Sequence, residues 1–258
     1  MSGLPCIPLA SSCIQYQRLQ FLREQMARLE EAWHRSPRLG TVSTGWPEFD
    51  RMLPSGGFLW GSLVEWLSPG DGSGVMSLAL RAVASACSRG SFLIIFDSLG
   101  EFYPLGAFYL GIPPENLVII RPKNERDKHW ALVQTLRGAE GCIVVASLQR
   151  LDSLSFRRLQ LAAERGGSLG VFIRPPGARP EPSWAEVRLW AEPISAKKGT
   201  FAGGLIASRR WQIQILRCRG KWQPSQILEI ELDAQTPTVR CFPQLAHPEI
   251  FARVTTSA

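Results

Sequence analysis

The stretch that most constrains the fold is residues 63–78, where an apolar segment runs into a glycine-rich turn and then into a helical pattern. This order is that of a phosphate-binding P-loop, in which successive backbone N–H groups and the N-terminus of the following helix form a concave anion site. It predicts an α/β fold in which mostly parallel strands alternate with helices.

The P-loop pattern also requires a Lys followed by Ser or Thr after its last glycine, and this chain has neither. The candidate nucleotide-binding loop, called here the P-loop remnant, consists of Pro69, Gly70, Asp71, Gly72, Ser73, Gly74, Val75 and Met76. Val75 stands where the Lys would stabilise the outer phosphates, and Met76 where the hydroxyl would hold magnesium. The sequence therefore predicts the scaffold of an ATPase without its chemistry, with no catalytic residue, no metal site and no cofactor. Weak ATP binding without hydrolysis stays open, because the loop N–H groups are retained.

Several features of composition bear on the compartment and on the partners. None of the six cysteines among the 258 residues forms a C-x-x-C pair, which favours reduced thiols. The chain shows neither a secretory signal nor an apolar run of the ~18 residues that a membrane span needs. We therefore expect a cytoplasmic protein without a membrane segment. Its net charge of +7 favours polyanionic partners.

The positive charge is concentrated near the C-terminus, because residues 193–228 contain no Asp or Glu. Two tryptophans, Trp211 and Trp222, interleave with the cations there, and an aromatic side chain beside Arg suits stacking on an unpaired base. We expect a nucleic-acid contact in this segment, and a subunit contact or pairing with acids elsewhere in the fold are the alternatives. The candidate contact residues are Lys197, Lys198, Arg209, Arg210, Trp211, Arg217, Arg219 and Lys221.

Residues 14–34 carry apolar side chains at alternating spacings of three and four, which predicts an amphipathic helix. This face either packs on the core of its own chain or docks on a partner protein. Its apolar residues are Leu19, Leu22, Met26, Leu29 and Trp33. The chain then divides into an N-terminal arm and helix (1–38), a core (39–232) and a proline-containing, loosely ordered tail (233–258).

Within the core, continuous apolar runs are typical of buried parallel strands. Period-two patterns at residues 187–190, 211–216 and 227–232 indicate antiparallel strands at the edge of the sheet. The expected parallel strands are residues 62–67, 91–96, 117–120, 142–146 and 169–173. The expected helices are residues 76–88, 103–110, 127–137 and 154–165.

Residues 40–232 resemble the core of the bacterial recombinase RecA. The similarity begins with Ser43-Thr44-Gly45, Asp50, Gly56-Gly57, Gly61, Val64-Glu65 and Pro69, and continues through Phe96-Asp97 and Leu110-Gly111. More specifically, residues 157–164, 209–211 and 216–220 look like the ImuA family. The resemblance implies a RecA-like core and a RecA-related accessory protein of damage-induced mutagenesis, a group sometimes labelled as SulA-like cell-division inhibitors.

Residue by residue, the active-site positions that the resemblance assigns have changed. Besides Val75 and Met76, Leu99 falls where RecA has its water-activating Glu, with Glu101 two residues away. Ala146 replaces the Asp that ends the fourth strand and holds the magnesium shell. The segments that RecA uses to grip single-stranded DNA are short here, which argues against a RecA-style filament.

The resemblance thus implies a catalytically inactive adaptor in SOS-induced translesion DNA synthesis and DNA repair. Its implied partners are an ImuB-type polymerase-like protein, an error-prone DnaE-type polymerase, RecA and single-stranded DNA. Three alternatives stay open at this point: a RecA-type DNA-binding ATPase with an unorthodox site, a cell-division inhibitor that binds FtsZ, and a structural protein.

Overall fold

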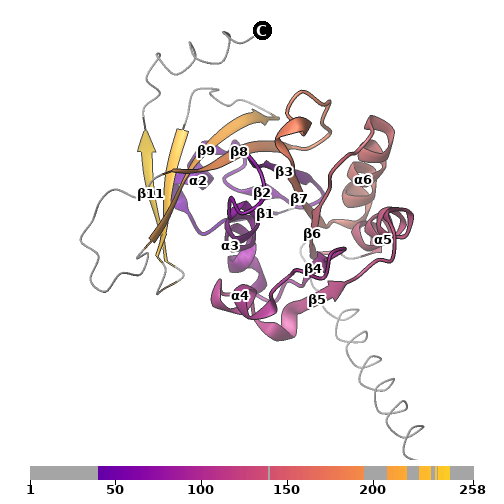
Figure 1. Cartoon of the computed structure of the whole chain (residues 1–258). Coiled ribbons are helices and arrows are strands. Elements are labelled where there is room, and N and C mark those ends of the chain that lie inside the picture. The colour runs from indigo at the N-terminus through magenta and orange to yellow at the C-terminus, as the bar shows by residue number, and fades with distance from the viewer. Residues whose placement is uncertain are drawn as a thin grey trace, which may run out of the picture. The chain divides into compact units, whose positions relative to one another are not determined.

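The computed structural model describes residues 40–138, 140–194, 208–219, 227–233, 236 and 238–244. Its centre is a nine-stranded sheet of order β11-β10-β9-β8-β3-β7-β6-β4-β5. Helices α3 and α4 lie on one side of this sheet, and α5 and α6 lie on the other (Figure 1). This is the doubly wound α/β arrangement that the alternating pattern predicts.

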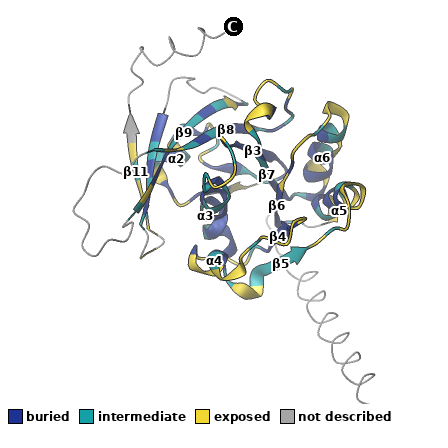
Figure 2. Ribbon diagram, viewed as in Figure 1, coloured by how far each residue is buried: buried dark blue, intermediate teal, exposed yellow. Residues whose placement is uncertain are grey.

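Six strands form the parallel part of the sheet, in which every pairing joins neighbours that run in the same direction. All five residues of the central strand are buried, which explains why it reads as a continuous apolar run. Figure 2 shows the buried residues concentrated along these strands and on the helix faces turned toward them. The parallel strands are β3 (Leu63–Leu67), β4 (Leu93–Phe96), β5 (Leu117–Ile120), β6 (Ile143–Ser147), β7 (Leu169–Arg174) and β8 (Val187–Ile194).

The expected helices are confirmed with boundaries shifted by one or two residues. Asp152 caps the start of one of them, since its carboxylate accepts a hydrogen bond from the backbone N–H of Ser155 at 2.9 Å. The helices are α3 (Val75–Cys87), α4 (Pro104–Tyr109), α5 (Glu125–Gly138) and α6 (Ser153–Gly166).

A small unit precedes the large sheet and accounts for the Ser-Thr-Gly motif. Strands β1 (Thr41–Val42) and β2 (Phe58–Leu59) pair antiparallel, with helix α2 (Pro47–Met52) between them. The Asp50 carboxylate accepts hydrogen bonds from the Ser43 hydroxyl at 2.7 Å, and from the Thr44 hydroxyl and backbone N–H at 2.8 and 3.1 Å. These bonds close the turn that leads into the helix.

Two expectations about the C-terminal strands are wrong. Strand β8 is not an antiparallel edge strand, because it runs parallel to β3 on one side and antiparallel to β9 (Ser208–Cys218) on the other. The expected tail contributes a strand, β11 (Val239–Gln244), which pairs antiparallel with β10 (Ile227–Asp233) and ends the sheet. Pro243 obscured this strand in the sequence, but proline is tolerated at a sheet edge, where one side of the strand needs no partner.

Other expectations fall outside the described residues, namely the N-terminal arm and the apolar face at Leu19, Leu22, Met26, Leu29 and Trp33. Among the described helices, none has the length and apolar character to span a bilayer.

A buried ionic cluster joins the three central strands. The Glu65 carboxylate of β3 lies 2.9 Å from the Nε of Arg188 on β8 and 3.8 Å from the Nη1 of Arg174 on β7. It also accepts a hydrogen bond of 2.6 Å from the Ser183 hydroxyl. Arg174 pairs with Glu181 as well, and the Arg188 guanidinium donates to three carbonyls of residues 178–181. The cluster therefore fixes the segment that connects β7 to β8.

Candidate functional site

The P-loop remnant connects β3 to α3 and keeps the backbone of a glycine-rich turn. Gly72 and Gly74 have φ values of 75° and 74°, in the left-handed region that favours glycine. Gly74 is the N-cap of α3. The next two side chains diverge, because Val75 is buried in the core whereas Met76 lines a cavity. Neither of them offers a cation or a hydroxyl to the loop.

Trp211 of β9 closes the end of the P-loop remnant. Its indole Nε1 donates a hydrogen bond of 2.7 Å to the carbonyl oxygen of Ser73, and the side chain is 2% exposed. The ring lies so close to the loop that a Cβ added at Gly74 would stand 2.8 Å from its Cζ2 atom. Trp211 is therefore a wall of the site, and the prediction that it contacts nucleic acid is wrong because the indole is buried.

This contact predicts different effects for two glycines of the same loop. Gly74→Ala is expected to lower the free energy of unfolding by roughly 2–3 kcal/mol, because a left-handed residue is strained and the methyl group displaces Trp211. Gly72→Ala carries only the backbone cost of about 1–2 kcal/mol, since no atom lies within 4 Å of its added Cβ. Urea denaturation of the two variants measures the difference, and equal losses would contradict the role of Trp211.

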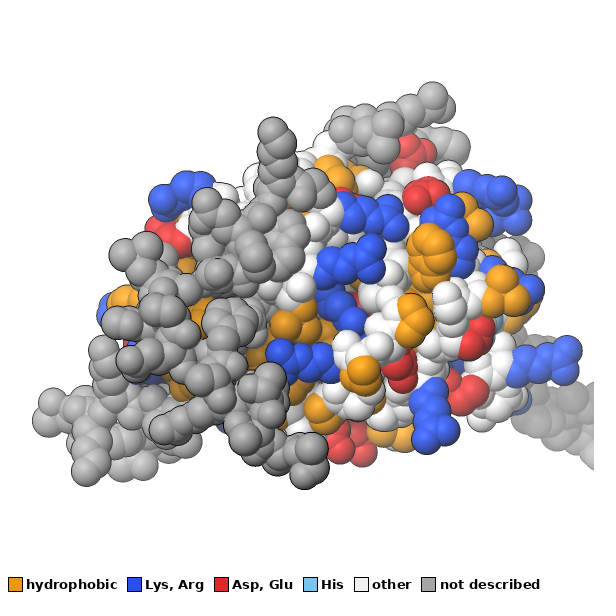
Figure 3. Space-filling view, turned by 90° about the horizontal axis from the view of Figure 1, so that it is seen from above, with side chains coloured by type: hydrophobic (Ala, Val, Ile, Leu, Met, Phe, Trp, Pro, Cys, Tyr) orange, Lys and Arg blue, Asp and Glu red, His pale blue; other side chains and the backbone are white. Residues whose placement is uncertain are grey.

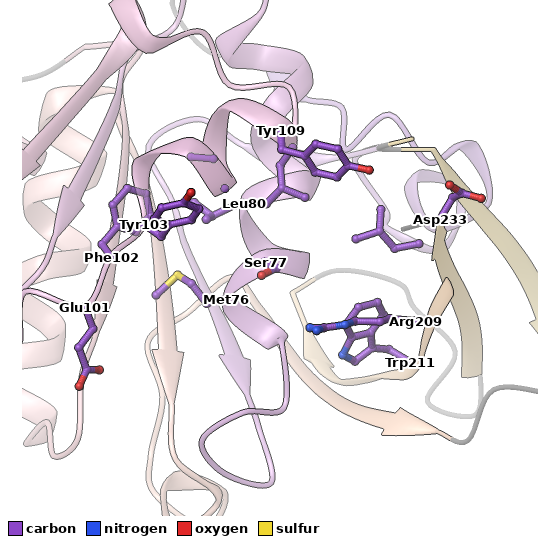
Figure 4. Close-up of a pocket in the computed structure, with 14 residues that line it drawn as sticks. Met76, Ser77, Leu80, Glu101, Phe102, Tyr103, Tyr109, Arg209, Trp211 and Asp233 are labelled. Atoms are coloured by element: carbon purple, nitrogen blue, oxygen red, sulfur yellow. The ribbon is translucent and has the colours of Figure 1, made fainter. Parts of the chain in front are cut away.

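A cavity of about 770 Å³ lies beside the P-loop remnant. Helix α3 contributes Met76, Ser77 and Leu80, and the segment that enters α4 contributes Phe102 and Tyr103. Arg209 and Trp211 of β9 form the opposite wall, together with Leu232 and Asp233 of β10 (Figure 4). The lining is mainly apolar and aromatic, and Arg209 is its one cation among the described residues.

The loop after β4 is shaped by Asp97, which is 7% exposed. Its carboxylate accepts hydrogen bonds from the backbone N–H groups of Glu101 and Phe102 at 3.0 and 3.3 Å, and from the Arg121 guanidinium at 3.0 Å. Burial raises the pKa of Asp97, but the three donors outweigh it, so that the pKa lies below its ordinary value. The loop places Glu101 at the cavity, whereas Leu99 is 79% exposed.

A carboxyl group whose pKa is lower in the folded protein than in the unfolded chain stabilises the fold at every pH above the unfolded pKa. This stabilisation is lost as the pH falls through the folded pKa. Asp97→Asn is therefore expected to cost about 1–3 kcal/mol at pH 7 and less at pH 3, because pH 3 lies below the ordinary carboxyl pKa, so that the unfolded chain binds a proton there and the advantage of the charged folded form declines. Urea denaturation at the two pH values measures this, with Asp71→Asn in the exposed part of the P-loop remnant as a control. A cost that does not change with pH would show that the carboxylate charge has no such role.

The predicted basic segment divides into parts with different surroundings. Arg210 is 8% exposed and pairs with Glu229 and Glu231 of β10, so the prediction that it meets a polyanion is wrong and it is a structural cation. Arg217 is exposed and donates to the Ser183 carbonyl at 2.8 Å, and Arg219 lies 3.6 Å from Glu186. Lys197, Lys198 and Lys221 lie outside the described residues.

Cations are nevertheless prominent on one face of the molecule. Figure 3 shows Lys and Arg side chains running through the middle of this face, with hydrophobic and acidic side chains beside them. Two arginines of the described residues lie over tryptophan rings: Arg157 is 4.6 Å from the ring centroid of Trp184, and Arg179 is 5.2 Å from that of Trp190. Such pairs hold the guanidinium groups in place.

No sequence motif pointed to the apolar surface around α4, which none of the predictions covered. Leu99, Tyr103, Leu105 and Phe108 are each at least 60% exposed, and Tyr109 is 43% exposed. The signal was present, because residues 102–110 contain four aromatic side chains and no charge. A helix that faces solvent without a charged side chain is unusual enough to mark this segment.

No family model matches the chain. It is 26% identical to Protein ImuA of Caulobacter vibrioides NA1000 over 239 residues, which cover 86% of this chain and 96% of the relative. It is 32% identical to Protein RecA of Chlorobaculum parvum over 51% of this chain and 44% of that protein, and 34% identical to Protein RecA of Brucella canis over 50% and 35%. The resemblance to ImuA is thus confirmed over most of the chain, whose core is that of a RecA-like protein.

Proposed function

We propose that this chain is a non-hydrolysing, RecA-related adaptor in SOS-induced translesion DNA synthesis, which bridges an error-prone polymerase complex and RecA or DNA. The observation that carries the proposal is the P-loop remnant itself. It retains the left-handed glycines of a phosphate-binding turn, but Val75 is buried in the core and Met76 lines an apolar cavity.

The loss extends to the other positions that a RecA-type ATPase uses. Ala146 is fully buried in β6 and has no carboxylate for a magnesium shell, and Leu99 cannot activate water. Among the described residues, Glu101 is the one carboxylate on the cavity wall formed by α3, α4 and the loop before α4, and no cation accompanies it on that wall. The described part of the chain contains no cluster of three or more side chains that could hold a metal ion. Each missing group is worth roughly 10²–10⁴ in rate, so that their joint loss argues against turnover.

The likeness to ImuA supports the choice of pathway and of partners. An ImuB-type polymerase-like protein, a DnaE-type polymerase and RecA are the partners that we propose, in the cytoplasm. The segment after β7, residues 175–182, stands where the resemblance places the second DNA-gripping loop of RecA. The ionic cluster around Glu65 fixes this segment through side chains that are buried in three strands, which supports an adaptor over a filament.

The first test is phosphate release by the purified protein, with and without single-stranded DNA, next to RecA as a positive control. We expect no steady-state turnover above background under either condition. ATP turnover that is abolished by Glu101→Gln would contradict the adaptor function and would identify the protein as a working ATPase with an unorthodox site.

The second test concerns the pathway. We expect a tagged chain from damaged cells to co-purify with a polymerase-like protein, and a deletion strain to lose damage-induced mutagenesis. Normal induced mutagenesis in the deletion strain would contradict the proposal. Filamentous growth on overexpression, with binding to purified FtsZ, would instead support a cell-division inhibitor.

A further inference from the structure

The exposed hydrophobic side chains of this protein are gathered in one place. Of the eight large ones that are exposed among the described residues, five lie between residues 99 and 109. We call these five residues the α4 patch: Leu99, Tyr103, Leu105, Phe108 and Tyr109. Contiguous apolar surface of this kind marks an interaction site on a soluble protein, whereas single exposed apolar residues need no explanation.

The α4 patch continues into the cavity beside the P-loop remnant. Tyr103 and Tyr109 belong to both, since they line the cavity and are also exposed (Figure 4). Met76, Leu80 and Trp211 form its apolar depth. A partner that covers the patch would therefore also find a pocket for a bulky side chain, which is the arrangement in which docking energy is concentrated.

Two charges flank this apolar surface and limit what it accepts. Glu101 and Arg209 are exposed on opposite sides of the cavity (Figure 4), and neither belongs to an ion pair formed within the described part of the chain. Asp233 lines the cavity too, but its carboxylate already accepts a hydrogen bond of 2.8 Å from the Thr236 N–H. The occupant that complements this surface carries a large apolar side chain between a cation and an anion.

We propose that the cavity and the α4 patch dock an amphipathic helix of a partner protein. Its bulky apolar side chain enters the cavity, a Lys or Arg meets Glu101, and an Asp or Glu meets Arg209. A helix fits better than an added strand, because the exposed apolar groups are side chains of α4 and of the loop before it, not the backbone of a free strand edge. Anchors spaced by three or four residues match such a surface. The proposal rests on the adaptor function, and it assigns the degenerate nucleotide site to peptide recognition.

The test begins with a phage-displayed library of random helical peptides selected on the full-length protein. We expect enriched peptides to share two large apolar residues spaced by three or four, with a basic residue on one side and an acidic residue on the other. A synthetic copy of the strongest peptide is then titrated by fluorescence anisotropy. Enriched peptides without this pattern, or none that bind the protein, would overturn the proposal.

Variants then locate the bound peptide. Ser77→Phe, which fills the cavity, and Phe108→Ser, which removes an exposed apolar group, are each expected to weaken binding about tenfold or more. Trp130→Ser on α5 and Leu154→Ser on α6 are matched controls, because these side chains are 66% and 63% exposed on the other side of the sheet. Equal effects at all four positions would show unspecific apolar adhesion.

A charge exchange tests orientation and does not depend on filling the cavity. Glu101→Arg should weaken binding by roughly fivefold, and changing the basic residue of the peptide to Glu should restore it. Absence of rescue contradicts the predicted orientation. Competitive displacement of the peptide by ATP would show that the cavity is still a nucleotide site. The peptide experiments test docking alone. The adaptor function is tested separately, by phosphate release and by induced mutagenesis, so that a failure of one proposal can be told from a failure of the other.

Discussion

Glu65→Leu is expected to lower the free energy of unfolding by about 3–5 kcal/mol, which is a large share of the stability of a domain. The Glu65 side chain is 1% exposed and is the shared acidic partner of Arg174 and Arg188, which are 1% and 9% exposed. Removing it leaves Arg188 with carbonyl partners but no buried counter-charge. The connection after β7 should then loosen, because the same arginines hold residues 178–181.

Chemical denaturation followed by circular dichroism measures this loss. Glu48→Gln is the matched control, because Glu48 and Arg51 form an ion pair of 3.1 Å at the surface, where such pairs contribute about 0–1 kcal/mol. The double variant Glu65→Leu with Arg188→Leu should recover part of the loss, since a buried pair can be replaced by apolar side chains. A single Glu65→Leu variant as stable as the natural protein would show that the cluster does not stabilise the fold.

Gly166→Ala is expected to cost about 3 kcal/mol or more. Gly166 is the last residue of α6, and a Cβ there would stand 2.0 Å from the carbonyl oxygen of Leu136 and 2.7 Å from that of Arg137, both in α5. These are backbone atoms that no rotamer change moves, so α6 must shift away from α5. Overpacking typically costs about 1–3 kcal/mol, and the upper end or more is expected where the opposing atoms belong to the backbone.

Gly138→Ala provides the control within the same pair of helices. Gly138 ends α5 as Gly166 ends α6, but no atom lies within 4 Å of its added Cβ. Alanine favours a helix over glycine by up to ~1 kcal/mol, so this variant should be as stable as the natural protein or slightly more stable. Similar melting temperatures for the two variants would contradict the close approach of α5 and α6.

The parallel strands could be predicted because a strand buried on both faces reads as a continuous apolar run. Strand β3, for example, is buried along its whole length and lies within the expected residues 62–67. The helices could be predicted because their buried face repeats apolar residues at spacings of three and four. The position of β8 could not be predicted from such patterns. Its apolar residues report burial, whereas its direction relative to β3 depends on the chain crossing the sheet after β7, which no local pattern records.

The site was predicted in part. The P-loop remnant was recognised from its glycines, because left-handed backbone restricts the residue type. Trp211 was assigned to nucleic acid, since its neighbours in sequence are cations, yet its indole turns inward to a carbonyl 138 residues away. Glu65 offered a signal that was not used: a single acid inside an apolar strand needs a buried cation, and Arg174 and Arg188 both lie in strands that adjoin β3.

The order of strands also governs how this chain folds while it is being synthesised. Strand β3 emerges from the ribosome early, but both of its neighbours in the sheet, β7 and β8, come more than one hundred residues later. Until residue 174 has left the exit tunnel, β3 has no partner on either edge, and one edge stays unpaired until residue 194 follows. Pairing over such a separation in sequence is slow. Nascent chains that stall before β7 is complete should therefore be the ones that recruit chaperones and aggregate.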